Sequence, residues 1–170
     1  MILKSSTVPD QSVLSRKEHY DFIDSYSATF VTDKVISSDD LARSFFSSDS
    51  KWITYLFVLR NKIVSLFGLK TGENNQQQVL LNSYVVGESI GLFKIIQKTE
   101  KEIIFGENDK HLDFKVSLLI DQSKISNSVI TISTVVIFNN FFGRFYFFFI
   151  KSFHKLIVPN MLKKMVRTYS

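Results

Sequence analysis

The sequence has no cysteine and few residues that interrupt regular structure, since only two prolines and six glycines occur in 170 residues. Without cysteine the chain can form no disulfide, no thiolate zinc site and no cysteine nucleophile. So few prolines and glycines leave little room for long flexible linkers. The N-terminus, MILKSSTVPDQS, also lacks the apolar run of a secretory signal. We therefore expect a cytoplasmic protein.

Acidic residues are absent from the C-terminal part of the chain. All 16 acidic residues lie at or before Asp121, whereas the last 32 residues hold six basic residues. The net charge of +5 therefore belongs to this C-terminal segment. A basic segment of this kind favours weak contact with phosphates or with an anionic membrane surface. The simpler interpretation is a solvated helix face whose last turns favour cations through the helix dipole.

Phenylalanine is unusually frequent, with 17 residues in the chain. Each buried aromatic ring removes about 150–250 Å² from water, so we expect phenylalanine to dominate the core. The length fits a single domain. We assign residues 1–18 to an irregular N-terminal arm and residues 19–170 to that domain.

The first half of the chain has one strand pattern followed by two helix patterns. His19 to Phe30 alternates as a strand does. Ser37 and Asp40 have the spacing of a capping box and predict a short helix over Asp39–Phe46. A second helix is predicted over Lys51–Phe67, because its apolar residues fall within about 80° of one another on a helical wheel.

After the polar loop 71–78, apolar residues recur at every second position, as in a strand. Near the C-terminus they recur with the helical period of 3.6 residues. Short connections between the strands indicate antiparallel hairpins. The last helix is predicted to begin at Asn139 and to end near Val158, because Pro159 follows. The fold class is therefore α+β: a curved antiparallel sheet grips a long C-terminal helix, and two shorter helices follow the first strand. The predicted strands after the loop are Val79–Val86, Ile90–Lys98, Glu102–Gly106, His111–Asp121 and Ser128–Phe138.

The last helix is apolar over most of its circumference. An apolar arc of about 200° exceeds what one sheet face usually covers. The simpler explanation is a helix deeply gripped by a curved sheet and by the two shorter helices. The alternative is a cavity wall together with an apolar contact to a partner, such as a second copy of the chain, through Phe147, which lies within the polar sector. The predicted core stripe is Phe142, Phe145, Phe149, Phe153 and Leu156, and the polar sector is Arg144, Lys151, His154 and Lys155.

One polar cluster has residue types that can carry chemistry. Glu107, Asp109, His111 and Asp113 alternate at spacing two, so on a strand they would share a face and could move protons or bind a hard metal. However, Gly106 to Lys110 also has the composition of a hairpin turn, and side chains in a turn do not alternate between two faces as they do in a strand. We favour the turn, and we assign neither catalytic residues nor a metal site.

Other classes of function lack support in the sequence. No phosphate-binding glycine loop, nucleotide fingerprint or nucleophile motif is present, so no cofactor is expected. The basic segment carries no RNA-binding motif, and we expect no nucleic-acid partner. The uncharged stretch Ile125–Gly143 contains eight serine, threonine and asparagine residues and a β-branched run, which favour a strand over a membrane span.

Several segments resemble a bacterial family known as domain of unknown function 2867. They span most of the chain after residue 45, although Ser152 stands where we expect proline. The resemblance implies a START or Bet v 1-like helix-grip fold, with no established catalytic residues. Members of that family also occur fused behind NAD(P)-binding Rossmann domains, and no such domain is present here. The segments are LRNKIVSLFGLKTG, IGLFKI, GENDKHLDFKVSLLI and TVVIFNNFFGRFYFFFIKSFHKLIVPNMLKKM.

The leading hypothesis is that the domain binds a hydrophobic small molecule, such as a lipid, a polyketide-like or a quinone-like compound, in an apolar cavity under the last helix. One alternative is a cyclase or dehydratase-type enzyme that uses the same cavity, with His111 and its carboxylate neighbours as acid–base groups. Another is a non-catalytic protein-interaction domain. The residues expected to line the cavity are Phe114, Val116, Ile132, Phe142, Phe145 and Phe149.

Overall fold

The structure is a computed structural model that describes residues 1–16, 19–47, 58, 84–90, 93–124 and 127–170. Apart from Val58, the predicted helix Lys51–Phe67 lies outside the described residues. Residues 79–83 of the predicted strand Val79–Val86 also lie outside them.

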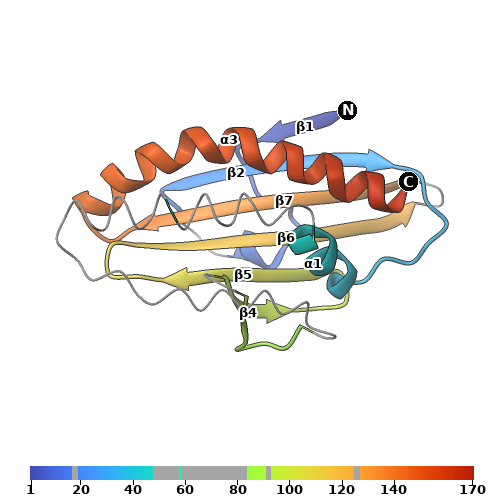
Figure 1. The fold of residues 1–170 in the computed structure, drawn as a ribbon, viewed down its shortest axis with the longest axis horizontal. Coiled ribbons are helices and arrows are strands. Elements are labelled where there is room, and N and C mark those ends of the chain that lie inside the picture. Colours follow the sequence, from blue (N-terminus) through green and yellow to red (C-terminus); the bar gives the residue numbers. More distant parts are fainter. Residues whose placement is uncertain (17–18, 48–57, 59–83, 91–92, 125–126) are drawn as a thin grey trace.

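The described strands form one antiparallel sheet in the order β1-β2-β7-β6-β5-β4-β3 (Figure 1). The longest pair, β6 and β7, lies at its centre and is flanked by β2 and β5. The predicted α+β class, an antiparallel sheet with a long C-terminal helix, is confirmed. The strands are β1 (Ile2–Ser5), β2 (Phe22–Phe30), β3 (Ser89–Ile90), β4 (Phe93–Lys98), β5 (Glu102–Asn108), β6 (Leu112–Lys124) and β7 (Asn127–Phe138).

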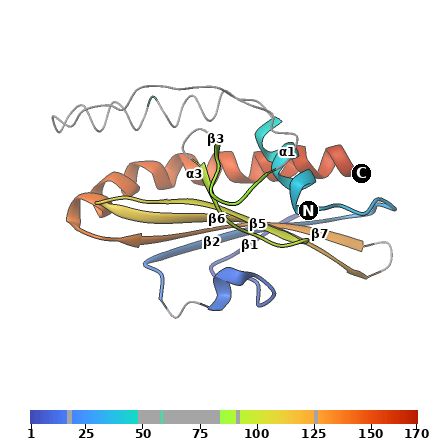
Figure 2. The same ribbon diagram turned by 90° about the horizontal axis from the view of Figure 1, so that it is seen from below.

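Helices α1 (Ser38–Ser47) and α3 (Phe141–Tyr169) lie on one face of the sheet, and the 3₁₀ helix η1 (Val13–Arg16) lies on the other (Figure 2). The capping box of α1 is confirmed. The Asp40 backbone N–H donates to Ser37 Oγ at 3.2 Å, and the Ser37 backbone N–H donates to an Asp40 carboxylate oxygen at 3.0 Å. These two bonds satisfy donors that a helix start otherwise leaves free.

The main core lies between the sheet and the helices of this face. Alternation along β6 directs Val116, Leu118 and Ile120 toward α1 and α3, and the three side chains are buried. α1 contributes Phe45 and Phe46 to the same cluster. Phenylalanine therefore contributes to the core as expected, although several phenylalanines of α3 do not.

The predicted rotation of α3 is wrong. The stripe that packs on the sheet includes Phe147, Val158, Met161 and Met165, whereas Phe145 and Phe149 are each 43% exposed. Phe153 and Leu156 are exposed too. An arc this wide does not fix which side of a helix faces the sheet, because both orientations bury apolar side chains.

Phe147 is consequently a core residue, with only 6% of its surface exposed. Its ring packs on Phe22 at a centroid distance of 4.7 Å and on Phe138 at 5.5 Å. The expectation that Phe147 contacts a partner from the surface is therefore wrong.

Pro159 does not end the last helix, which continues to Tyr169. A proline inside a helix costs about 3 kcal/mol. This cost is offset by the residues after Pro159, because Met161, Leu162 and Met165 are buried in the core. Among the described residues, no helix combines the length and the hydropathy that a membrane span requires.

Two further boundaries differ from the prediction. The strand predicted over Ile90–Lys98 is two antiparallel strands, in which Ile90 pairs with Phe93. The N-terminal arm is not irregular throughout, since Ile2–Ser5 forms the edge strand β1 and Val13–Arg16 forms η1. The assignment of residues 19–170 to a single domain stays a prediction.

Candidate functional site

Three of the six predicted cavity residues belong to the sheet. Val116 and Ile132 are buried in the main core, and Phe114 is partly buried against it. The ring of Phe114 meets the ring of Phe93 edge-on, with centroids 6.0 Å apart. These three side chains therefore lie on the sheet face that α3 covers.

The other three belong to α3. Phe145 and Phe149 contact each other, with ring centroids 5.1 Å apart, on the half-exposed side of the helix. Phe142 packs its ring on His111 at 4.7 Å. The structure thus places the six residues in two groups, one in the sheet and one on the helix. That both groups line one cavity stays a prediction.

The hairpin segment Gly106–Asp113 contains the end of β5, a turn at residues 109–111 and the start of β6, and it docks on the start of α3. The turn is therefore shorter than the predicted Gly106–Lys110, because Gly106–Asn108 belong to β5. The Asp109 N–H donates to the Leu112 carbonyl, which closes the turn at 3.1 Å. Asn139 donates its side-chain amide to the Asp109 carbonyl and to the Asp113 carboxylate. Asp113 is therefore engaged with the residues that precede α3.

Asn140 caps α3 and joins the cap to the same hairpin. Its side-chain oxygen accepts from the Gly143 N–H at 3.0 Å, and its amide donates to the Lys110 carbonyl at 3.1 Å. The amide also lies 3.1 Å from His111 Nδ1. A Cβ on Gly143 would overlap the carbonyl of His111. Glycine therefore lets the first turn of α3 rest on the hairpin backbone, and these contacts give His111 a structural role.

Among the described residues, no three histidine, aspartate or glutamate side chains gather closely enough to hold a metal ion. The arrangement that stands out is a polar cluster beneath the middle of α3, which is buried except for Lys4 at its edge. We call it the His154 cluster, and it consists of His154, Asp24, Thr134, Tyr26 and Lys4.

The His154 cluster follows from strand register and helix periodicity. Asp24 pairs with Thr134 across β2 and β7, and Lys4 pairs with Tyr26 across β1 and β2. Side chains two apart on a strand share a face, so Asp24 and Tyr26 point the same way. His154 lies seven residues after Phe147 and therefore belongs to the stripe of α3 that faces the sheet.

The contacts of the cluster leave two atoms unpaired. His154 Nε2 lies 2.8 Å from the Thr134 hydroxyl, and Tyr26 donates to an Asp24 carboxylate oxygen at 3.2 Å. Lys4 Nζ lies 3.5 Å and His154 Nδ1 lies 4.0 Å from that same oxygen. His154 Nδ1 and the other oxygen of Asp24 are buried and have no hydrogen-bond partner in the described part of the chain.

Burial governs the electrostatics of this cluster. Desolvation lowers the pKa of His154 below its ordinary value of 6.5; the Asp24 carboxylate opposes this shift and Lys4 adds to it. Burial and then the Asp24 carboxylate raise the pKa of Tyr26. At neutral pH the cluster therefore presents an uncharged imidazole, which can donate from one nitrogen and accept at the other.

Sequence analysis missed the His154 cluster. It placed His154 on the polar side of the helix with Lys151 and Lys155, whereas the imidazole is only 14% exposed. One signal could have found it. The spacing of Phe147, His154, Val158 and Met165 follows the helical repeat, so a correct rotation of α3 would have brought His154 onto the sheet.

Residues 17–161 match the family described as Protein of unknown function (DUF2867). This match covers most of the chain, and the protein belongs to that family. No curated protein and no solved structure matches the chain. The match includes Asp24, His154 and the hairpin that docks on α3.

Proposed function

We propose that this domain binds a small hydrophobic molecule, of a lipid-, polyketide- or quinone-like kind, beside the phenylalanine-rich side of α3. The observation that carries the proposal is the rotation of this helix. Phe147, Val158 and Met161 already hold α3 on the sheet, so Phe145, Phe149 and Phe153 are not needed for that packing. They are 43–50% exposed.

Exposed rings in such a row are costly in water. A phenylalanine side chain gains about 1.5–3 kcal/mol on full burial, so a ligand that covers several half-exposed rings gains substantial free energy. Large exposed apolar patches on soluble proteins commonly mark binding sites. A long helix beside an open antiparallel sheet is also compatible with a ligand-binding domain.

Binding of the neutral fluorophore 1-aminoanthracene tests this proposal. Phe145→Ala and Phe149→Ala each remove a ring that the ligand would cover, and we expect each to weaken binding about tenfold, which corresponds to about 1.4 kcal/mol. Phe141→Ala is the matched control, because Phe141 is 82% exposed at the first residue of α3 and lies outside the predicted site.

Circular dichroism and thermal unfolding of each variant separate lost binding from lost folding, because removal of a partly buried ring also lowers stability. The proposal fails if the folded wild-type protein does not bind the fluorophore, or if all three variants weaken binding equally. Equal weakening together with self-association in sedimentation would instead favour the protein-interaction domain.

An enzyme of cyclase or dehydratase type is the second candidate, and the buried unpaired atoms of the His154 cluster favour it. His111 is engaged with Asn140 and Phe142, so His154 with Asp24 is the better acid–base pair. General acid–base catalysis requires a group whose proton can move near neutral pH.

The compounds that copurify with wild type and with His154→Gln distinguish catalysis from binding alone. A dehydrating enzyme predicts that the variant retains the compound one water molecule heavier than the compound on the wild type. Identical compounds on both proteins would exclude this role for His154.

A further inference from the structure

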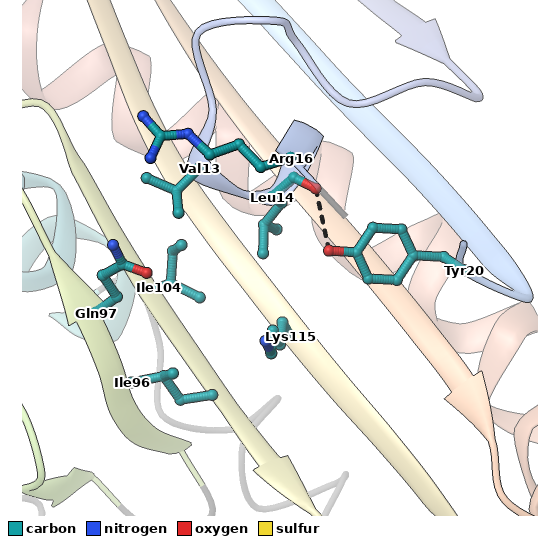
Figure 3. A pocket seen from close by; sticks show the side chains of 8 residues that line it. All are labelled: Val13, Leu14, Arg16, Tyr20, Ile96, Gln97, Ile104 and Lys115. Carbon is teal, nitrogen blue, oxygen red and sulfur yellow. Dashed lines mark hydrogen bonds between the residues drawn. The ribbon is translucent and has the colours of Figure 1, made fainter. Parts of the chain in front are cut away.

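A second candidate site lies on the opposite face of the sheet. η1 crosses this face and leaves a pocket of about 330 Å³ between itself and strands β4, β5 and β6 (Figure 3). Volumes of this order suit small ligands. The pocket is lined by Val13, Leu14, Arg16, Tyr20, Ile96, Gln97, Ile104 and Lys115.

The wall that η1 provides is fixed in place by hydrogen bonds. The buried Glu102 carboxylate accepts from the hydroxyls of Ser12 and Ser117, and from the Val13 N–H at 2.8 Å. The Tyr20 hydroxyl donates to the Leu14 carbonyl at 3.0 Å, as Figure 3 shows. These bonds hold η1 above the sheet, so the pocket is formed before any ligand binds.

The floor and walls are largely apolar. Leu14 and Ile104 are buried in a small core cluster of this face, and Val13 and Ile96 pack against that cluster. An inorganic anion alone would leave this surface uncovered. The pocket therefore suits a molecule with an apolar body.

The charged lining groups are both cations. Arg16 and Lys115 come from η1 and β6, and no acidic residue lines the pocket in the part of the chain that the structure describes. Within the described residues neither cation forms an ion pair. The carboxylate of Glu102 is occupied by its three donors, and Asp113, two residues from Lys115, accepts from Asn139.

We propose that this pocket binds a small organic anion, in which a carboxylate or sulfonate is attached to an apolar or aromatic body. Lys115 and Arg16 provide the positive charge that attracts the anionic group, and the body packs between Leu14, Ile96 and Ile104 (Figure 3). Either an ammonium or a guanidinium can donate charge-assisted hydrogen bonds to a carboxylate. This site is separate from the one beside α3, because the sheet lies between them (Figure 2).

Isothermal titration calorimetry with naphthalene-2-carboxylate tests this proposal, and the neutral isostere 2-naphthalenemethanol is the matched ligand. We expect the carboxylate to bind the wild-type protein at least tenfold more tightly than the alcohol. Lys115→Gln and Arg16→Gln should each weaken carboxylate binding about tenfold. Lys94→Gln removes the same charge from an exposed position on β4 that does not line the pocket, and should change little.

Phe149→Ala provides a further control, because it alters only the site proposed beside α3 and should leave carboxylate binding unchanged. Circular dichroism verifies that each variant is folded. The proposal is overturned if wild-type protein does not bind the carboxylate at millimolar concentration, if the alcohol binds equally well, or if Lys94→Gln weakens binding as much as Lys115→Gln. Failure here would leave the proposal for α3 untouched.

Discussion

His154 occupies a position where a helix facing a sheet normally carries an apolar side chain. Its neighbours in the buried stripe of α3 are Phe147 and Val158. Burying a polar side chain is costly unless its hydrogen bonds are satisfied. Thr134 satisfies one ring nitrogen of His154, and the other faces Asp24 at 4.0 Å without a hydrogen bond. Hydrogen bonds within the protein therefore offset only part of the free energy that the imidazole loses when it leaves water.

This arrangement predicts a dependence of stability on pH. Because the folded-state pKa of His154 is lowered, the unfolded chain binds the proton more tightly than the folded protein does. The contribution of His154 to stability is therefore complete above pH 6.5, and it decreases as the pH falls below that value. The free energy of unfolding, measured by urea denaturation at pH 7.5 and 5.5, should fall more for wild type than for His154→Gln.

Other groups titrate in this range, and the comparison with the variant removes their common contribution. His19→Gln is the matched substitution outside the His154 cluster, since the His19 side chain is 79% exposed. The slope of His154→Gln should differ from the wild-type slope more than that of His19→Gln does. An unchanged slope in His154→Gln would show that His154 is not responsible for the pH dependence.

At the scale of elements, the start of α3 and the β5–β6 hairpin stabilise each other. Asn140 bonds both to the helix, through Gly143, and to the hairpin, through Lys110 and His111. Gly143 permits the close approach. One short polar segment therefore fixes both where the helix begins and how it is rotated on the sheet.

Removing this cap should destabilise the protein more than removing an ordinary helix cap. Asn140→Ala is expected to lower the free energy of unfolding by about 2 kcal/mol, at the upper end of N-cap losses, because the bonds to the hairpin are lost as well. Asn160→Ala is the matched control, since Asn160 is exposed and donates within α3 to the Leu156 carbonyl. Urea denaturation of both variants measures the difference, and equal losses would contradict this account.

The sequence predicts those elements whose pattern depends on local chemistry. The Ser37–Asp40 capping box is confirmed, and the strand predicted over His111–Asp121 is observed as β6, with the bounds Leu112–Lys124. The rotation of α3 is not local. Apolar residues surround most of the helix, so its orientation is set by contacts with distant segments, such as Gly143 on His111 and Phe147 on Phe22.

This dependence on contacts between distant segments also explains which candidate functional residues the sequence reveals. His111 and Asp113 are noticeable in sequence because they lie close together, and their hairpin proves to be a docking element for α3. Asp24 and His154 are 130 positions apart, and only the pairing of β2 with β7 beneath α3 brings them together. Pro159 shows the converse, since local chemistry predicts a helix end that burial of Met161 and Leu162 overrides.

At the scale of the whole molecule, the sheet separates two surfaces of different chemistry. One face carries α1, α3, the main core and the half-exposed phenylalanines of α3. The other carries η1, a smaller apolar cluster and a pocket with two cations. An apolar ligand suits the first face and an organic anion suits the second.

The central claim is that the phenylalanine side of α3 holds an apolar small molecule. Native mass spectrometry of the freshly purified protein tests it most directly. The account predicts a second species heavier than the bare chain, whose added mass is an organic-extractable compound released on denaturation. Phe149→Ala should reduce the fraction of this species, whereas Phe141→Ala should not. A single species at the bare mass, in a protein that also fails to bind 1-aminoanthracene, would contradict the claim.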